Sequence, residues 1–143
     1  MAYIQFLSQQ EQSREDIFLR IMKSAYQIPN LDNIFYQHYS QEINLSKVYY
    51  DNGNRIEESI DFLSESITTY REYLKYLDEE NPCVVLNAIE GKRLICLFSA
   101  DKVRCKNLVF EFAAQYLKNY PDEYLLIDQN ELYDLKRIQN LLK

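Results

Sequence analysis

The carboxylates that could carry chemistry in this chain are concentrated between residues 57 and 80. Glu58, Asp61 and Glu65 are spaced three and four residues apart, so on a helix they would share one face. Two acidic residues can suffice for glycosidase-type catalysis, but only at the right separation in space. A di-metal carboxylate bundle would require Glu-x-x-His pairs, and the only histidine is His38. The pattern therefore predicts either a solvated helix face or a binding surface.

Tyrosines are interleaved with this acidic stretch. Tyr70, Tyr73 and Tyr76 recur every third residue, so on a helix they turn gradually around the axis, and Tyr73 and Tyr76 reach its surface. Tyrosine offers a large contact area at little cost in rotamer entropy, and carboxylates complement Lys or Arg on a partner. The candidate partner-binding residues are therefore Glu58, Asp61, Glu65, Glu72, Tyr73, Tyr76, Glu79 and Glu80.

The scarcity of glycine and histidine excludes several classes of enzyme. A phosphate-cradling loop needs clustered glycines, whereas Gly53 and Gly91 are isolated, so Walker-type and dinucleotide-type sites are excluded. His38 lies among Tyr and Phe residues, where we expect it at the edge of the core rather than in a catalytic triad. We expect no cofactor and no metal, and the three cysteines are expected to be buried thiols. These cysteines are Cys83, Cys96 and Cys105.

Composition indicates one ordinary globular domain. The chain has 143 residues, of which 47% are hydrophobic and 27% are charged, with a net charge of −6. That charge argues against direct binding of nucleic acid and favours a basic protein partner. The absence of a basic leader or a long apolar stretch predicts a cytoplasmic protein that does not enter a membrane.

Hydrophobic periodicity and turn residues predict the order of the elements. The strongest repeat runs from Ile56 to Leu77 with spacings of three and four residues, and the turn sequence Asp51-Asn52-Gly53-Asn54 precedes it. The predicted elements are helices over residues 10–28 and 31–39, a strand over 43–50, a long helix over 55–79, a hairpin of strands 83–86 and 94–98, a helix over 102–119 capped by Asp101, a strand over 123–127, and a terminal helix from Asp128.

This order predicts a single α+β domain over residues 1–143, with a three- to four-stranded sheet packed by helices. Its N-terminal part, residues 1–42, is expected to be helical, and residues 43–143 are expected to contain the sheet.

The functional hypothesis is a non-catalytic acidic module, a monomer or homodimer, that binds a basic protein. Its sharper form is an immunity protein, antitoxin or inhibitor that occludes the active site of a toxin or nuclease. The alternatives are a module that self-associates through the repeat at residues 56–77 or the terminal helix, and a carboxylate-based hydrolase.

Overall fold

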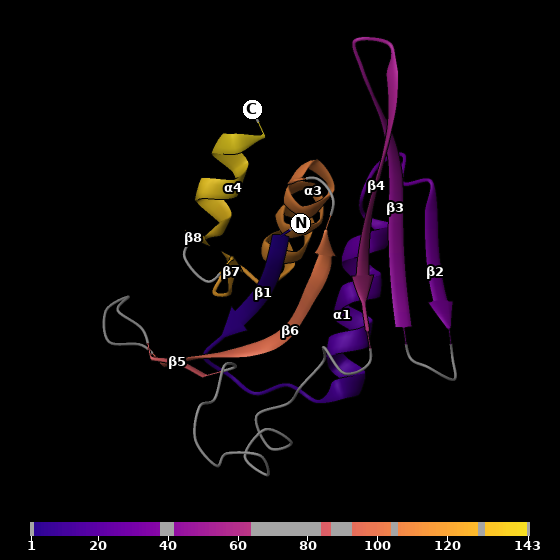
Figure 1. Ribbon diagram of the computed structural model, residues 1–143. Coiled ribbons are helices and arrows are strands. Elements are labelled where there is room, and N and C mark those ends of the chain that lie inside the picture. The colour runs from indigo at the N-terminus through magenta and orange to yellow at the C-terminus, as the bar shows by residue number, and fades with distance from the viewer. Residues whose placement is uncertain are drawn as a thin grey trace.

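The computed structural model describes residues 2–37, 42–63, 84–86, 93–103, 106–128 and 131–142. Within these ranges the chain has an α+β fold, with two antiparallel sheets and three helices (Figure 1). The strands are β1 (Ala2–Ser8), β2 (Asn33–Gln37), β3 (Glu42–Asp51), β4 (Asn54–Phe62), β5 (Val84–Leu86), β6 (Arg93–Val103), β7 (Tyr124–Ile127) and β8 (Glu131–Tyr133). The helices are α1 (Arg14–Tyr26), α3 (Lys106–Asn119) and α4 (Leu135–Leu141). One sheet has five strands in the order β5-β6-β1-β7-β8, and the other has the order β2-β3-β4.

Strand β1 lies in the middle of the five-stranded sheet and pairs antiparallel with β6 and β7. Its residues Ile4, Phe6 and Leu7 are fully buried, as expected for a central strand covered on both faces. The prediction that residues 1–42 form a helical part is therefore wrong, because this segment supplies β1 and β2 in addition to α1.

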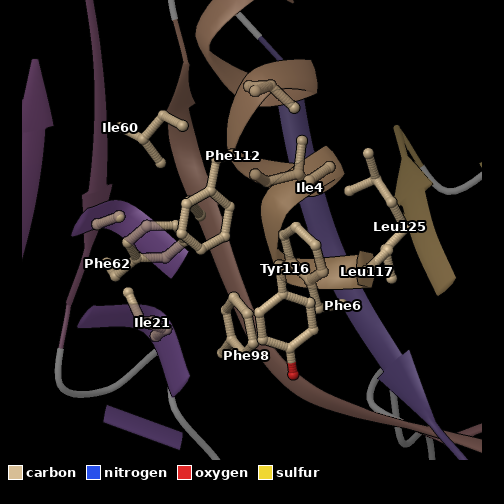
Figure 2. Close-up of a cluster of buried hydrophobic side chains, with 14 of the residues drawn as sticks. Ile4, Phe6, Ile21, Ile60, Phe62, Phe98, Phe112, Tyr116, Leu117 and Leu125 are labelled. Atoms are coloured by element: carbon tan, nitrogen blue, oxygen red, sulfur yellow. The ribbon is translucent and has the colours of Figure 1, made fainter. Parts of the chain in front are cut away.

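A cluster of aromatic rings joins the two sheets through α3 (Figure 2). Phe6 of β1 stacks on Phe98 of β6, with ring centroids 4.6 Å apart. Phe112 of α3 meets Phe6 edge to face at 5.6 Å, and it also lies 5.2 Å from Phe62 of β4. Because Phe62 belongs to the three-stranded sheet, both sheets share one hydrophobic core.

The hairpin of β3 and β4 corrects the predicted long helix. Asn52 and Gly53 have φ values of 51° and 81°, so the expected turn forms as a two-residue hairpin loop of the type that requires positive φ at both positions. Residues 54–62 then return as β4, in which Glu58, Ile60 and Phe62 alternate toward the core. The prediction of a helix from residue 55 is wrong over this strand, and residues 64–79 of that helix lie outside the described residues.

The predicted helix over residues 31–39 is also wrong, because residues 33–37 form strand β2. Its pairing with β3 places Ile34 beside Leu45 and Tyr36 beside Ile43, on the face of the sheet that packs against the core. His38 lies outside the described residues.

The remaining predicted helices and strands are confirmed in type and corrected at their ends. The hairpin of β5 and β6, helix α1, strand β3 and strand β7 occur where they were expected. Strand β6 continues through Asp101, so this residue does not cap α3, which begins at Lys106. Strand β8 precedes the terminal helix, whose N-cap is Asp134 rather than Asp128, since the Asp134 side chain accepts a hydrogen bond from the backbone N–H of Arg137.

Candidate binding surface on the three-stranded sheet

The pairing register of β2, β3 and β4 sorts their side chains onto two faces. Ile34, Leu45 and Ile60 form one row on the face toward the core. Phe35, Asn44 and Asp61 form the adjacent row on the opposite face, where the Asn44 amide donates a hydrogen bond to the Asp61 carboxylate. We call this opposite face the outer face of the sheet.

Exposed hydrophobic side chains concentrate on α1 and this sheet. Among the described residues, eight large hydrophobic side chains are exposed, and six of them belong to these elements. The six are Leu19, Tyr26, Phe35, Tyr36, Tyr50 and Ile56. Single exposed apolar residues are ordinary, but a concentration of them in one part of a fold indicates an interaction site.

The tip of the β3–β4 hairpin projects beyond the other described elements (Figure 1). Tyr50 stands next to the turn and is 74% exposed, and every residue from 50 to 57 is exposed. The hairpin therefore offers an aromatic side chain on a protruding element, a shape that can enter a concave partner surface.

The exposed charge on these elements is mainly negative. Residues 14–37 and 42–62 carry eight Asp and Glu against five Lys and Arg. The exposed carboxylate residues among them are Glu15, Asp16, Asp32, Asp51 and Glu57, and the exposed bases are Lys23 and Arg55. A surface with this excess of carboxylates complements a basic partner.

Glu58 does not belong to the exposed surface. It is 0% exposed, and its carboxylate accepts a hydrogen bond of 2.8 Å from the backbone N–H of Leu108 in the first turn of α3. Burial raises the pKa of the Glu58 carboxyl above its ordinary value, although that hydrogen bond acts in the opposite direction. Glu58 and Asp61 lie on opposite faces of β4, so the expectation that they share one helix face is wrong. Glu58 joins β4 to α3 and is not available to a partner.

A second polar contact is made by the residue that pairs with Glu58 on the neighbouring strand. Lys47 is its cross-strand partner on β3, and the Lys47 ammonium donates to Glu111 of α3 at 2.7 Å and to the carbonyl oxygen of Pro29 at 3.1 Å. The Lys47 and Glu111 side chains are 11% and 26% exposed. This ion pair attaches the sheet to α3 beside the Glu58 contact.

A third polar cluster connects α1 to the end of α3. Arg20 donates to Glu123 at 2.6 Å, the Tyr116 hydroxyl donates to the same carboxylate at 2.6 Å, and the Arg20 guanidinium stacks on the ring of Tyr120 at 4.0 Å. Burial raises the pKa of the Glu123 carboxyl, although the bonds from Tyr116 and Arg20 oppose this shift. The cluster borders a polar pocket of about 290 Å³, but Arg20 and Glu123 already satisfy each other's charge.

Of the other residues predicted for the binding site, the structure describes only Asp61. Asp61 lies half-buried on the outer face of the sheet. Glu65, Glu72, Tyr73, Tyr76, Glu79 and Glu80 lie outside the described residues. Cys96 is buried as expected and its thiol donates to the carbonyl oxygen of Phe98, while Cys83 and Cys105 lie outside the described residues. Among the described residues, no cluster of His, Cys, Asp and Glu is suited to hold a metal ion.

The exposed hydrophobic residues were missed by the sequence analysis, although one of them had a visible signal. Leu19 falls outside the buried stripe of α1, which includes Ile17, Phe18 and Ile21, and an apolar residue off the stripe is exposed by helical geometry. Phe35 and Tyr36 carried no such signal, because they were assigned to a helix that does not form.

Comparisons with protein-family models, with curated proteins and with solved structures found no match for this chain. Within the described part of the chain, no helix is long and apolar enough to cross a membrane.

Proposed function

We propose that this protein is an acidic protein-binding module that attaches to a basic partner through α1 and the three-stranded sheet. The observation that carries the proposal concerns the residues whose exposure the structure describes: six of their eight exposed large hydrophobic side chains belong to these elements. Aromatic anchors surrounded by charge are typical of protein interfaces, and the excess of exposed carboxylates on the same elements selects a basic partner.

The specific form of the proposal is a neutralising protein, such as an immunity protein, an antitoxin or an inhibitor. The projecting hairpin with Tyr50 at its tip supports this form, because an exposed aromatic on a protruding element can fill an active-site cleft. Basic clefts are a common property of proteins that act on nucleic acid, since they must bind phosphates. A toxin or nuclease with such a cleft is the proposed target.

The experiment compares the wild-type chain with two double variants as tagged baits in the native cell at low salt. Phe35→Ser/Tyr50→Ser removes two exposed aromatic side chains from the sheet, and Leu141→Ser/Leu142→Ser removes two exposed apolar side chains at the end of α4. We expect one basic protein to be recovered with the wild type and with the C-terminal variant, and lost with the sheet variant. The purified partner should also lose its toxicity or nuclease activity when one equivalent of the wild-type chain is added.

Two results would overturn the proposal. One is equal recovery of the same proteins with all three baits, which would mean that the sheet does not select them. The other is recovery of no basic protein by the wild type. Circular dichroism of each variant confirms that a loss of binding does not arise from unfolding.

A further inference from the structure

Helix α1 carries a second hydrophobic row, outside the stripe that packs into the core. Leu19 and Tyr26 are 68% and 71% exposed, and Met22, which lies between them along the helix, is partly buried. These three residues are spaced by three and four, so they share one side of the helix. In two packed helices this spacing makes Leu19 and Tyr26 the a positions of a heptad and Met22 a d position. The row therefore has the geometry of a helix-packing seam.

An apolar groove borders this row and gives a facing side chain room to enter. Its volume is about 340 Å³, and it is lined by Glu15, Phe18, Leu19, Met22 and Tyr36. Tyr36 of β2 forms one side of the groove, where its ring meets that of Phe18 with centroids 6.0 Å apart. Because Leu19 and Met22 belong to both the row and the groove, a helix packed on α1 covers the two together.

The charged residues beside the row fit α1 to an antiparallel copy of itself. Asp16 and Lys23 are seven residues apart and both occupy e positions of the same heptad pattern. Antiparallel pairing brings the e residues of two helices next to each other, so Asp16 of each copy lies beside Lys23 of the other. Both residues are exposed, and neither makes an ion pair within the part of the chain that the structure describes. An antiparallel second copy therefore supplies each of them with a partner of opposite charge.

The antiparallel arrangement also matches the row itself. Leu19 packs against Met22 of the second copy, and Tyr26 lies opposite Glu15 of the second copy. The tyrosine hydroxyl can donate a hydrogen bond to that carboxylate. A parallel pair would instead place Glu15 against Glu15 of the second copy, and like charges repel. The surface is therefore self-complementary about a two-fold axis, as the interface of a symmetric dimer requires.

We infer that the protein forms a homodimer in which the exposed rows of two antiparallel α1 helices pack together, with ion pairs between Asp16 of each copy and Lys23 of the other. The inference goes beyond the proposed function and does not depend on it. In the dimer, α1 joins the two copies, and each copy keeps Phe35 and the hairpin tip with Tyr50 for the basic partner. A contact between two short helices is small, so we expect a dimer that dissociates in the micromolar range.

The test measures the monomer–dimer equilibrium by analytical ultracentrifugation at low salt, over protein concentrations from about 1 μM to about 1 mM. Asp16→Lys leaves two bases facing each other across the interface, and Lys23→Asp leaves two acids. Leu19→Ser removes one apolar side chain of the row, and Leu141→Ser removes an exposed apolar side chain of α4 as the matched control. Circular dichroism checks that each variant is folded.

We expect the mass of the wild type to rise with concentration from that of a monomer toward that of a dimer, and Leu141→Ser to follow it. Leu19→Ser should weaken dimerisation by about tenfold or more, and each charge variant alone by about fivefold or more. An equimolar mixture of Asp16→Lys and Lys23→Asp should dimerise about as tightly as the wild type, because opposite charges face each other in the mixed dimer.

The inference is overturned by a wild type that stays monomeric at every concentration, or by a Leu19→Ser variant that dimerises as tightly as the wild type. It is also overturned if the mixture of charge variants dimerises no better than its two components. If one of these results occurs while the basic partner is still captured through Phe35 and Tyr50, only the dimer fails. Capture of no basic protein would remove the proposed function and leave the dimer standing.

Discussion

The carboxylate of Glu58 accepts a hydrogen bond from the backbone N–H of Leu108, so a strand of one sheet caps the first turn of a helix that packs on the other. The first N–H groups of a helix have no partner within the helix, and an acceptor placed there satisfies one of them. The bond is 2.8 Å long and its acceptor residue is 0% exposed. This contact makes the position of α3 dependent on the register of β4.

We predict that Glu58→Gln makes the free energy of unfolding less dependent on pH. Burial raises the pKa of the Glu58 carboxyl in the folded state above its ordinary value of 4.5. This carboxyl therefore contributes most to the stability of the folded state when the pH is below 4.5, and the contribution is lost as the pH rises through the folded-state pKa. Gln keeps an acceptor for Leu108 without a charge. Urea unfolding between about pH 4 and pH 8 should therefore show Glu58→Gln gaining stability relative to the wild type as the pH increases.

The adjacent residue Glu57 provides the control for this prediction. Its side chain is 59% exposed, so Glu57→Gln should follow the pH dependence of the wild type. Glu58→Ala, which removes the acceptor as well as the charge, should be about 1–3 kcal/mol less stable than Glu58→Gln at every pH. A pH profile of Glu58→Gln parallel to that of the wild type would show that this carboxyl is not protonated more readily in the folded state.

We predict that Arg20→Met destabilises the protein by about 3–5 kcal/mol, because it leaves the buried Glu123 carboxylate without its cation. The Arg20 and Glu123 side chains are only 15% and 8% exposed. Arg20→Met/Glu123→Gln should recover part of the loss, since no uncompensated charge remains, and a double-mutant cycle by chemical denaturation measures this coupling. Lys23→Met on the exposed side of α1 is the control and should change the stability little. If Arg20→Met lost no more stability than Lys23→Met, the buried ion pair would be contradicted.

Helix α1 shows what local sequence can predict in this protein. Its buried residues recur with helical spacing, and Ser13 caps it by accepting a hydrogen bond from the N–H of Asp16. Both signals are contained within one segment of chain, so the helix was predicted correctly. The turn at Asn52-Gly53 was recognised for the same reason, because its chemistry depends only on those residues.

Strands β1 and β4 show why the rest was not predicted. Ile56 and Ile60 are four residues apart, a spacing that fits one face of a helix and also one face of a strand, and pairing with β3 decides between them. β1 pairs with β6 and β7, which lie about a hundred residues further along the chain, so no local signal reveals it. The candidate surface was missed for the same reason, since Phe35 is placed on the outer face only by the pairing of β2 with β3.

We predict that Gly53→Ala destabilises the protein by about 1–2 kcal/mol through backbone strain alone. Gly53 has a φ of 81°, and a Cβ added there would meet no atom within 4 Å, so steric contact contributes nothing. Asn54→Ala at the adjacent position, where φ is not positive, is the control. Thermal unfolding measures both variants, and equal melting temperatures would show that the turn tolerates a side chain at positive φ.

We predict opposite consequences for two phenylalanines, one in the shared core and one on the proposed binding surface. Phe6 is fully buried and contacts rings from β6 and α3, so Phe6→Ala should lose about 3–5 kcal/mol of stability through lost burial and the cavity left behind. Phe35 is 50% exposed on an edge strand, so Phe35→Ala should lose less than about 1 kcal/mol while weakening capture of the basic partner. Urea denaturation and capture at low salt test the two effects separately. A large loss of stability in Phe35→Ala would mean that this side chain supports the fold, and its exposure would then no longer argue for a partner.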